Sequence, residues 1–100
     1  MPEYLQVWRA RVPEEHVERL LAIRPQAIAE AQRLCPELLS AELVRLGDGT
    51  WLDVLRWSAP DGEERLMEHA ARFEALHSMH DLLEDAEQVG RGEIVEPAVR

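Results

Sequence analysis

Hydrophobic and polar residues alternate over three short stretches of the chain, 4–12, 40–46 and 50–57. Such alternation is typical of β-strands, because successive side chains point to opposite faces of a sheet. A Gly-Asp-Gly segment at 47–49 separates the second stretch from the third, and an Asp-Gly turn in this position predicts an antiparallel hairpin. A short last strand is expected over 89–95, weakened by its two glycines.

Two other segments have apolar residues at the spacing of amphipathic helices. The first begins at Pro13 and ends before Pro36, and Arg24 occupies one of its apolar positions. Pro25 lies in the middle of this segment and predicts a kink or a short break there. The second segment follows the third strand. Its apolar stripe changes track near Glu74, which predicts a bend or two short helices.

The resulting order, strand-helix-strand-strand-helix-strand, is the ferredoxin-like α+β pattern, an antiparallel sheet with helices on one face. Alternation along the third strand places Trp51, Asp53, Leu55 and Trp57 on one side of the sheet. We expect this side to be the face that the helices leave open. A bare aromatic face would form a large exposed apolar patch, so a second copy of the chain is expected to cover it. The pattern therefore predicts a homodimer.

Composition and charge narrow the class of protein. The chain has 100 residues, so residues 1–100 are taken as a single domain with a core at about 4–96. It carries 11 basic and 20 acidic residues, a formal net charge of −9, and every basic residue is an arginine. This acidic balance argues against a nucleic-acid partner or an anionic membrane surface, because both attract positive charge.

Other features point to a small protein of the cytoplasm. Cys35 is the only cysteine, which excludes an internal disulfide and a cysteine-based zinc site. No apolar run approaches the roughly 20 residues of a membrane span. The first residues lack the basic stretch and apolar core of a signal peptide, so a cytoplasmic location is expected.

Several segments, taken in order, resemble the antibiotic biosynthesis monooxygenase-like family, the dimeric α/β barrels. They are residues 7–13 (VWRARVP), 24–25 (RP), 41–46 (AELVRL), 48–58 (DGTWLDVLRWS) and 92–95 (GEIV). The resemblance implies a dimer in which two sheets face each other, and a pocket in each subunit between its own sheet and its second helix. Known members include heme-degrading enzymes and cofactor-free oxygenases of polyketide quinone formation, which need no metal or flavin.

The resemblance also marks individual residues. Trp57 matches the tryptophan that many members place at the end of the third strand, where it lines the pocket, and His69 matches a histidine often found on the following helix. Phe73 and His77 reproduce the spacing of the heme-degrading branch, in which a histidine four residues after a phenylalanine binds iron. The quinone-forming oxygenases also use an asparagine and tyrosines, whereas this chain has no asparagine and a single tyrosine, Tyr4.

Asp53 is a candidate base on the strength of its position between apolar residues. A carboxylate in an apolar pocket binds a proton more readily than one in water and can act as a base. Alternatively Asp53 pairs with an arginine, because buried acids are usually paired. Arg9, Arg45 and Arg56 are the partners that the sequence suggests, and the pair is the favoured interpretation.

His69, His77 and His80 form the main titratable cluster. They could supply a metal or heme ligand, or a general base active near neutral pH. In the alternative interpretation His80 faces solvent and His77 is half-buried at a helix end. No recognised ligand motif is present, so no metal site is expected.

Together these observations predict a cofactor-independent monooxygenase that acts on a planar aromatic or polyketide-like small molecule, with His69 or Asp53 as the base. Two alternatives stay open. One is a non-catalytic ligand-binding or regulatory homodimer, favoured by the absent asparagine and tyrosines, and the other is a heme-binding relative that uses His77. The residues expected to bind the substrate are Trp57, Trp51, Leu55, Phe73 and His77.

Overall fold

The computed structural model describes residues 2–69 and 74–96, apart from the side chain of His69. The order of elements is the predicted ferredoxin-like one, with the second helical segment divided in two. The elements are β1 (Tyr4–Arg11), α1 (Glu14–Leu34), β2 (Leu38–Arg45), β3 (Thr50–Trp57), α2 (Gly62–His69), α3 (Glu74–Asp81) and β4 (Glu84–Glu93).

The strands form an antiparallel sheet in the order β2-β3-β1-β4. The predicted hairpin joins β2 to β3. Its turn has Gly49 at φ +85°, a left-handed conformation that glycine adopts without a steric cost, and the Thr50 backbone N–H donates to Asp48 Oδ1 over 2.9 Å. This hairpin is confirmed.

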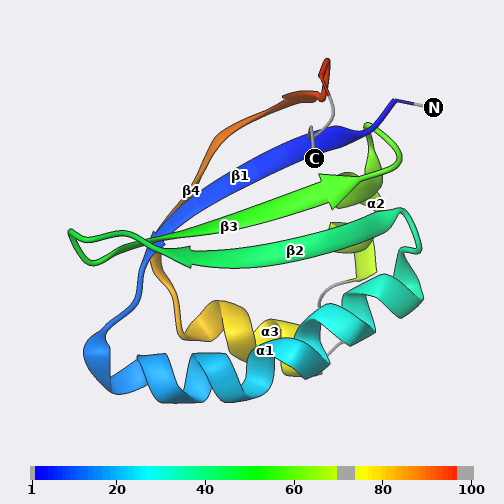
Figure 1. Cartoon of the computed structure of the whole chain (residues 1–100). Helices are drawn as coiled ribbons and strands as arrows, with labels where there is room; N and C mark the ends of the chain where they lie inside the picture. The colour runs from blue at the N-terminus through cyan, green and yellow to red at the C-terminus, as the bar shows by residue number, and fades with distance from the viewer. Residues whose placement is uncertain (1, 70–73, 97–100) are drawn as a thin grey trace.

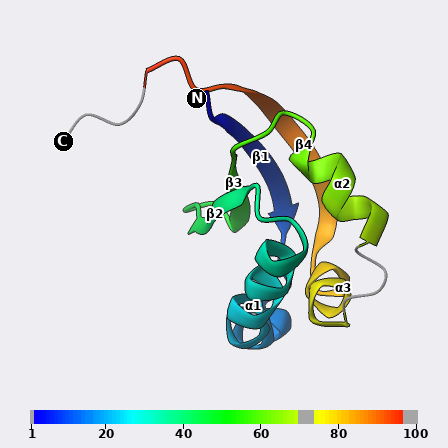
Figure 2. The same cartoon turned by 90° about the vertical axis from the view of Figure 1, so that its right-hand side faces the viewer.

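The helices of the described chain all lie on one face of the sheet, which we call the inner face (Figures 1 and 2). Trp51 and Trp57 point to this face, and with exposed fractions of 5% and 3% they belong to the core that the sheet shares with α1 and α3. The prediction that these tryptophans lie on the uncovered face is therefore wrong. Alternation separates the two faces of a strand, but it does not tell which of them the helices cover.

The opposite, outer face of the sheet is also apolar. Pairing across the strands places Leu5 beside Arg56, Val7 beside Val54, and Leu52 beside Val44. Leu5, Val7, Leu52 and Val54 are half-buried, whereas Val44 is 38% exposed. The face that a second copy of the chain would have to cover is therefore this outer one, with its smaller apolar residues, and not the tryptophan side.

Helix α1 begins where Pro13 and two carboxylates, Glu14 and Glu15, favour the positive end of the helix dipole. It ends at Leu34, and the next residue, Cys35, donates its backbone N–H to the Ala31 carbonyl over 2.8 Å. The helix is continuous through Pro25, so no break occurs there. Its ribbon changes direction near the middle, as a lost backbone hydrogen bond allows (Figure 1).

The C-terminal half differs from the prediction in its boundaries. The second helical segment consists of α2 and α3, in keeping with the change of apolar track near Glu74. Strand β4 starts at Glu84, five residues before the predicted start, and all ten of its residues are exposed. Its first half, Glu-Asp-Ala-Glu-Gln, has no apolar alternation by which the sequence could reveal it. Two register shifts against β1 and the positive φ of Asp85 accompany its irregular start.

A chain of side-chain hydrogen bonds crosses the inner face of the sheet. Trp57 Nε1 donates to Gln6 Oε1 over 3.1 Å, and Gln6 Nε2 donates to Gln88 Oε1 over 2.8 Å. Gln6 is 1% exposed, so its two amide atoms need these partners. The contacts tie β3, β1 and β4 together and fix the orientation of the Trp57 ring.

The same ring packs against the first residue of α2, and this contact allows a test of the fold. A Cβ added at Gly62 would lie 2.9 Å from Trp57 Cζ3 and closer still to Cε3. We therefore expect Gly62→Ala to lower the free energy of unfolding by about 1–3 kcal/mol, because the indole must move out of its packed position. Urea unfolding followed by tryptophan fluorescence measures the loss. The control is Gly47→Ala, where an added Cβ meets nothing within 4 Å. Equal stability of the two variants would contradict the packing.

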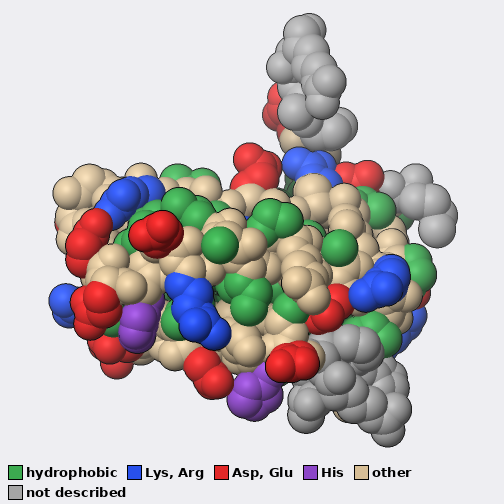
Figure 3. All heavy atoms as spheres, turned by 90° about the horizontal axis from the view of Figure 1, so that it is seen from below, with side chains coloured by type: hydrophobic (Ala, Val, Ile, Leu, Met, Phe, Trp, Pro, Cys, Tyr) green, Lys and Arg blue, Asp and Glu red, His purple; other side chains and the backbone are tan. Residues whose placement is uncertain are grey.

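Seen from the helix side, the surface carries arginines singly among acidic side chains, with apolar side chains between them (Figure 3). This arrangement agrees with the composition of the chain, in which 20 acidic residues outnumber 11 arginines. Within the described residues, none of the helices combines the length and apolar character that crossing a membrane requires.

Candidate functional site

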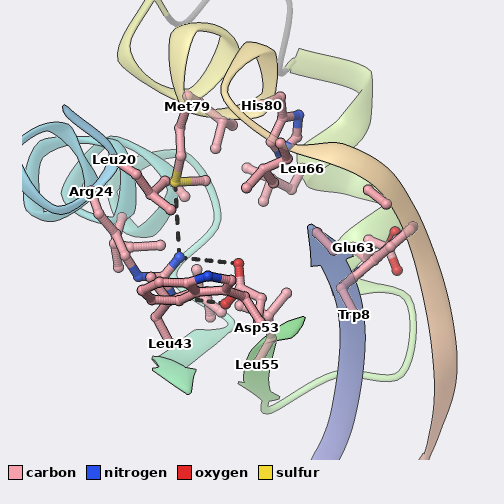
Figure 4. A pocket seen from close by; sticks show the side chains of 18 of the residues that line it. Trp8, Leu20, Arg24, Leu43, Asp53, Leu55, Glu63, Leu66, Met79 and His80 are labelled. Carbon is pink, nitrogen blue, oxygen red and sulfur yellow. Dashed lines mark hydrogen bonds and ion pairs between the residues drawn. The ribbon is translucent and has the colours of Figure 1, made fainter. Parts of the chain in front are cut away.

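A cavity of about 280 Å³ lies between the inner face and the three helices (Figure 4). Its wall is mostly apolar and includes the indoles of Trp8, Trp51 and Trp57. A volume near 300 Å³ is at the small end of the range for pockets that enclose organic ligands. The cavity wall includes four ionisable side chains, Arg24, Asp53, Glu63 and His80.

Arg24 and Asp53 form a two-pronged ion pair in the cavity wall. Nη2 donates to Oδ1 over 2.7 Å and Nη1 to Oδ2 over 3.1 Å, and the side chains are only 10% and 19% exposed. Nη1 also lies 3.9 Å from the Met79 sulfur (Figure 4). A planar guanidinium matches a carboxylate in this geometry, so the two groups hold each other in fixed positions.

Arg24 is a charged residue on the buried side of α1. It lies on the buried stripe of α1 with Leu20, Ala27 and Ala31, one turn from each neighbour of the stripe. Ala27 and Ala31, on the same stripe, are 0% and 1% exposed, so Arg24 belongs to a fully buried face of α1. An arginine at an apolar helix position was the sequence signal for this residue, and sequence reasoning did not assign it to the site.

His80 is exposed to solvent and also lines the cavity, on the α3 side, whereas Asp53 lies on the sheet side (Figure 4). Burial of the ring against its neighbours lowers the pKa of His80 below its ordinary value of 6.5. The positive field of His77 acts in the same direction, and the carboxylates of Asp53 and Asp81 oppose it. His80 is therefore neutral near pH 7. The interpretation that His80 faces solvent agrees with its exposure, and the same side chain also lines the cavity.

Glu63, in the first turn of α2, lines the cavity near Trp8. Burial raises the pKa of Glu63, and the neighbouring Glu64 adds to the rise, while Arg91 opposes both. Arg91 approaches Glu63 at 4.0 Å and makes its closer ion pair with Glu64. These contacts connect α2 to β4 beside the cavity.

The structure brings together several residues that the sequence had suggested. Asp53, Leu55, Trp51 and Trp57 all line the cavity. His77 does not share that position. It lies on the exposed side of α3, with its side chain 63% exposed and Nδ1 3.4 Å from Asp81 Oδ2.

Two further candidates cannot be placed. Phe73 and the side chain of His69 lie outside the described residues. His69 is the last residue of α2, and this is all that the structure describes of it.

Asp53 has an arginine partner, as favoured, but the partner is Arg24 and not one of the three that the sequence suggested. Those three pair elsewhere: Arg9 with Glu87, Arg45 with Glu14 and Arg56 with Glu3. Arg45 also lies over the Trp51 ring, 4.9 Å from its centroid. The sequence did not indicate the true partner, because Arg24 is on a helix, whereas the three suggested arginines are on strands.

Cys35 takes no part in the cavity wall. It is 2% exposed, and its thiol donates to Glu37 Oε2 over 3.1 Å. Burial, together with Glu37, raises the pKa of the Cys35 thiol to about 11, so the thiol stays protonated at neutral pH and is a poor nucleophile.

Within residues 2–69 and 74–96, no group of three or more His, Cys, Asp or Glu side chains has an arrangement that could hold a metal ion. The cavity is a mostly apolar, indole-lined space with one fixed ion pair, an imidazole whose lowered pKa favours its neutral form, and a half-buried carboxyl. Such a space can enclose a flat apolar molecule, offer hydrogen bonds to its polar groups and take up a proton.

Comparison with known proteins shows the fold. No protein-family model matches the sequence, and no curated protein matches it. Among solved structures, a variant of SnoaB, a cofactor-independent oxygenase from Streptomyces nogalater, is 17% identical with a TM-score of 0.67, over 97% of this chain and 95% of that one. A candidate antibiotic biosynthesis monooxygenase from Bordetella bronchiseptica is 14% identical with a TM-score of 0.77, over 96% of this chain and 100% of that one.

A dimeric ferredoxin-like protein from an uncultured marine organism is 11% identical with a TM-score of 0.69, over 100% of this chain and 94% of that one. At these identities the likeness is one of fold. The chain has the ferredoxin-like fold found in structures of antibiotic biosynthesis monooxygenases, over nearly its whole length.

Proposed function

We propose that the chain is a member of the antibiotic biosynthesis monooxygenase family and catalyses the cofactor-independent oxygenation of a planar aromatic or polyketide-like molecule. The observation that carries this proposal is the cavity of about 280 Å³ walled by Trp8, Trp51 and Trp57. Flat indole surfaces favour flat aromatic ligands by stacking. The solved oxygenase with the same fold, SnoaB, supports the same reaction class.

The proposed reaction needs little from the protein beyond a base and a protected space. Removal of a proton from the substrate gives an electron-rich anion, which reduces O₂ directly. The apolar wall excludes water, and this strengthens every electrostatic contact with the anion. Arg24 lines the cavity with both terminal nitrogens bound to Asp53, so we propose that the pair acts as a neutral polar contact that orients the substrate.

The roles inferred from the sequence fit this scheme to different degrees. Trp57 would form the stacking wall, with Trp51 and Leu55 beside it. Asp53 remains a proposed polar contact, but both of its oxygens accept hydrogen bonds from Arg24, which reduces its value as a base. His69 remains a proposal from the family resemblance.

We further propose that the chain forms a homodimer through the outer face of the sheet. The residues at its centre, Leu5, Val7, Leu52 and Val54, are apolar and only half-buried. Gly90 and Gly92 lie opposite Val7 and Leu5, so this part of β4 presents bare backbone beside the patch. The marine ferredoxin-like protein of the same fold is dimeric, which supports this assembly.

A non-catalytic ligand-binding dimer is the second candidate. The observation that favours it is the absence of asparagine and the single tyrosine, Tyr4, in a chain that otherwise has an aromatic cavity. This candidate predicts ligand binding without oxygen consumption. The heme-binding alternative has less support, because His77 lies on the exposed side of α3 and does not line the cavity.

Oxygen consumption with anthrone tests the proposal. We expect the protein to convert anthrone and O₂ to anthraquinone and water faster than the same buffer without protein. In Leu55→Trp the larger side chain fills part of the cavity, so turnover should fall at least about 100-fold. The control is Leu21→Trp, at a residue on α1 that is 53% exposed. Tight binding of anthraquinone with no oxygen uptake would favour the non-catalytic binder.

A further inference from the structure

The four ionisable side chains in the cavity wall differ in how they are engaged. Arg24 and Asp53 hold each other through two hydrogen bonds, and Glu63 lies within 4.0 Å of Arg91. No hydrogen bond or ion pair between the described residues engages the imidazole of His80. His80 is thus the cavity residue that can offer a lone pair to a ligand without first giving up an ionic partner.

The place of His80 in the fold suits a group that takes up protons repeatedly. It lies in the last turn of α3, lines the cavity and is also exposed to solvent. Leu66 and Met67 of α2 and Leu83, just after α3, line the same cavity as His80. A base at the boundary between an apolar cavity and bulk water can receive a proton from the ligand and pass it to water after each turnover.

We propose that His80 is the catalytic residue that removes the proton from the bound substrate. This inference rests on the proposed function, because it assigns the base of that reaction. The neutral ring accepts the substrate proton on a nitrogen, the C–H or O–H bond breaks, and its electron pair stays on the substrate. O₂ then accepts electrons from the resulting anion. The Arg24–Asp53 pair on the opposite wall positions the substrate and is not itself consumed.

Charge within the cavity also sets the class of substrate. Arg24 and Asp53 cancel each other's charge, His80 is neutral at neutral pH, and Glu63 adds no positive charge. No surplus positive charge therefore faces a ligand from these lining groups. The cavity should favour a neutral weak acid, such as a phenol or an enolisable aromatic ketone, over a carboxylate or a phosphate.

The pH dependence of the reaction follows from the groups around the ring. Burial of the ring and the charge of His77 lower the pKa of His80, while Asp53 and Asp81 raise it, and the net shift is downward. Glu63 and Arg24 are the other charged groups of the cavity wall. Because the neutral ring is the active form, kcat/KM should rise with pH through this lowered pKa, with its midpoint below the ordinary histidine value of 6.5.

Two readouts test His80, one with turnover and one without. For His80→Gln we expect kcat/KM for anthrone to fall at least about 100-fold and the acid limb of the pH profile to disappear. Alizarin, a hydroxyanthraquinone whose visible spectrum reports its ionisation, tests proton transfer directly. At a pH where the free dye is neutral, the wild-type protein should bind it as the anion, and His80→Gln should bind it as the neutral form. Far-UV circular dichroism checks that the variant is folded.

The matched control is His77→Gln, the same substitution three residues earlier on the exposed side of α3. It should keep the acid limb, displaced slightly to higher pH because a neighbouring positive charge is gone. A His80→Gln protein that keeps the limb and still binds alizarin as the anion would overturn the assignment, whether or not anthrone is oxidised. If the wild type consumes no oxygen but ionises alizarin only when His80 is present, the proposed function fails and His80 stands as the proton acceptor.

Discussion

Arg24→Met is expected to lower the free energy of unfolding by about 3–5 kcal/mol, the largest loss among the substitutions considered. The methionine keeps most of the packing of the arginine stem but leaves the Asp53 carboxylate in the cavity wall without its two donors. Asp53 is 19% exposed on its side chain, so water can replace those donors only in part. Urea unfolding at neutral pH, followed by circular dichroism, measures the change.

A double-mutant cycle separates the ion pair from the packing. Arg24→Met with Asp53→Leu should recover most of the lost stability, because an apolar pair of similar volume leaves no unpaired charge. The control is Arg45→Met, which breaks a pair with Glu14 whose side chains are 53% and 85% exposed. Solvent screens that pair, so its loss should stay within about 1 kcal/mol. Equal effects of Arg24→Met and Arg45→Met would contradict a special role for the buried pair.

The cycle also bears on the cavity. The double variant replaces the polar part of the cavity wall by two apolar side chains, and it should bind flat hydrocarbons at least as well as the wild type. It should bind hydroxylated rings less well, because the Arg24 donors and Asp53 acceptors are gone. Complete removal of the pair is thus expected to leave the free energy of unfolding near the wild-type value and to weaken the binding of hydroxylated rings.

Most of the fold could be predicted because it depends on local patterns. The turn at 47–49, the alternation of 50–57 and the apolar spacing of 14–34 each indicate their element directly, and their order indicates the architecture. The covered face of the sheet could not be predicted in this way. Trp51 and Trp57 are apolar on one side of β3, and Leu52 and Val54 are apolar on the other, so patterning gives two candidate inner faces.

What decides between the faces is contact with residues outside β3. Gly62 leaves room for the Trp57 ring, and Gln6 supplies the partner of its indole N–H. Gln6 is on another strand and Gly62 follows Trp57 by five residues, outside the alternating pattern of β3, and neither forms a recognisable motif. Which face of the sheet the helices cover therefore becomes clear only when the positions of α2 and β1 are known.

The candidate site shows the same division. Asp53, Leu55 and Trp57 could be found because they follow one another on a single strand. Arg24 carried a signal, a charge on an apolar helix stripe, but its partner lies on another element. His80 could not be told from His77, because the phase of α3 depends on where that helix begins after the preceding one ends.

Val54→Asp is expected to abolish the proposed homodimer and to raise its dissociation constant at least about 100-fold. Val54 is at the centre of the outer face, paired with Val7 on one side and with Glu42 on the other. In a symmetric dimer the substitution occurs in both copies, so two carboxylates would lose water at one interface. Analytical ultracentrifugation over a range of concentrations measures the change, and the wild type should sediment as a dimer.

The control is Leu21→Asp, which places the same charge on α1, on the helix side of the molecule, at a residue that is 53% exposed. It should leave the dimer intact. Val54 and the cavity lie on opposite faces of β3, so Val54→Asp should still bind anthraquinone with near wild-type affinity if each subunit folds alone. A wild type that sediments as a monomer, or a Val54→Asp protein that remains dimeric, would show that the outer face is not the interface. Loss of both the dimer and the cavity would instead mean that the apolar outer face must be covered for the subunit to fold, as expected where a small domain depends on its partner for enough buried surface.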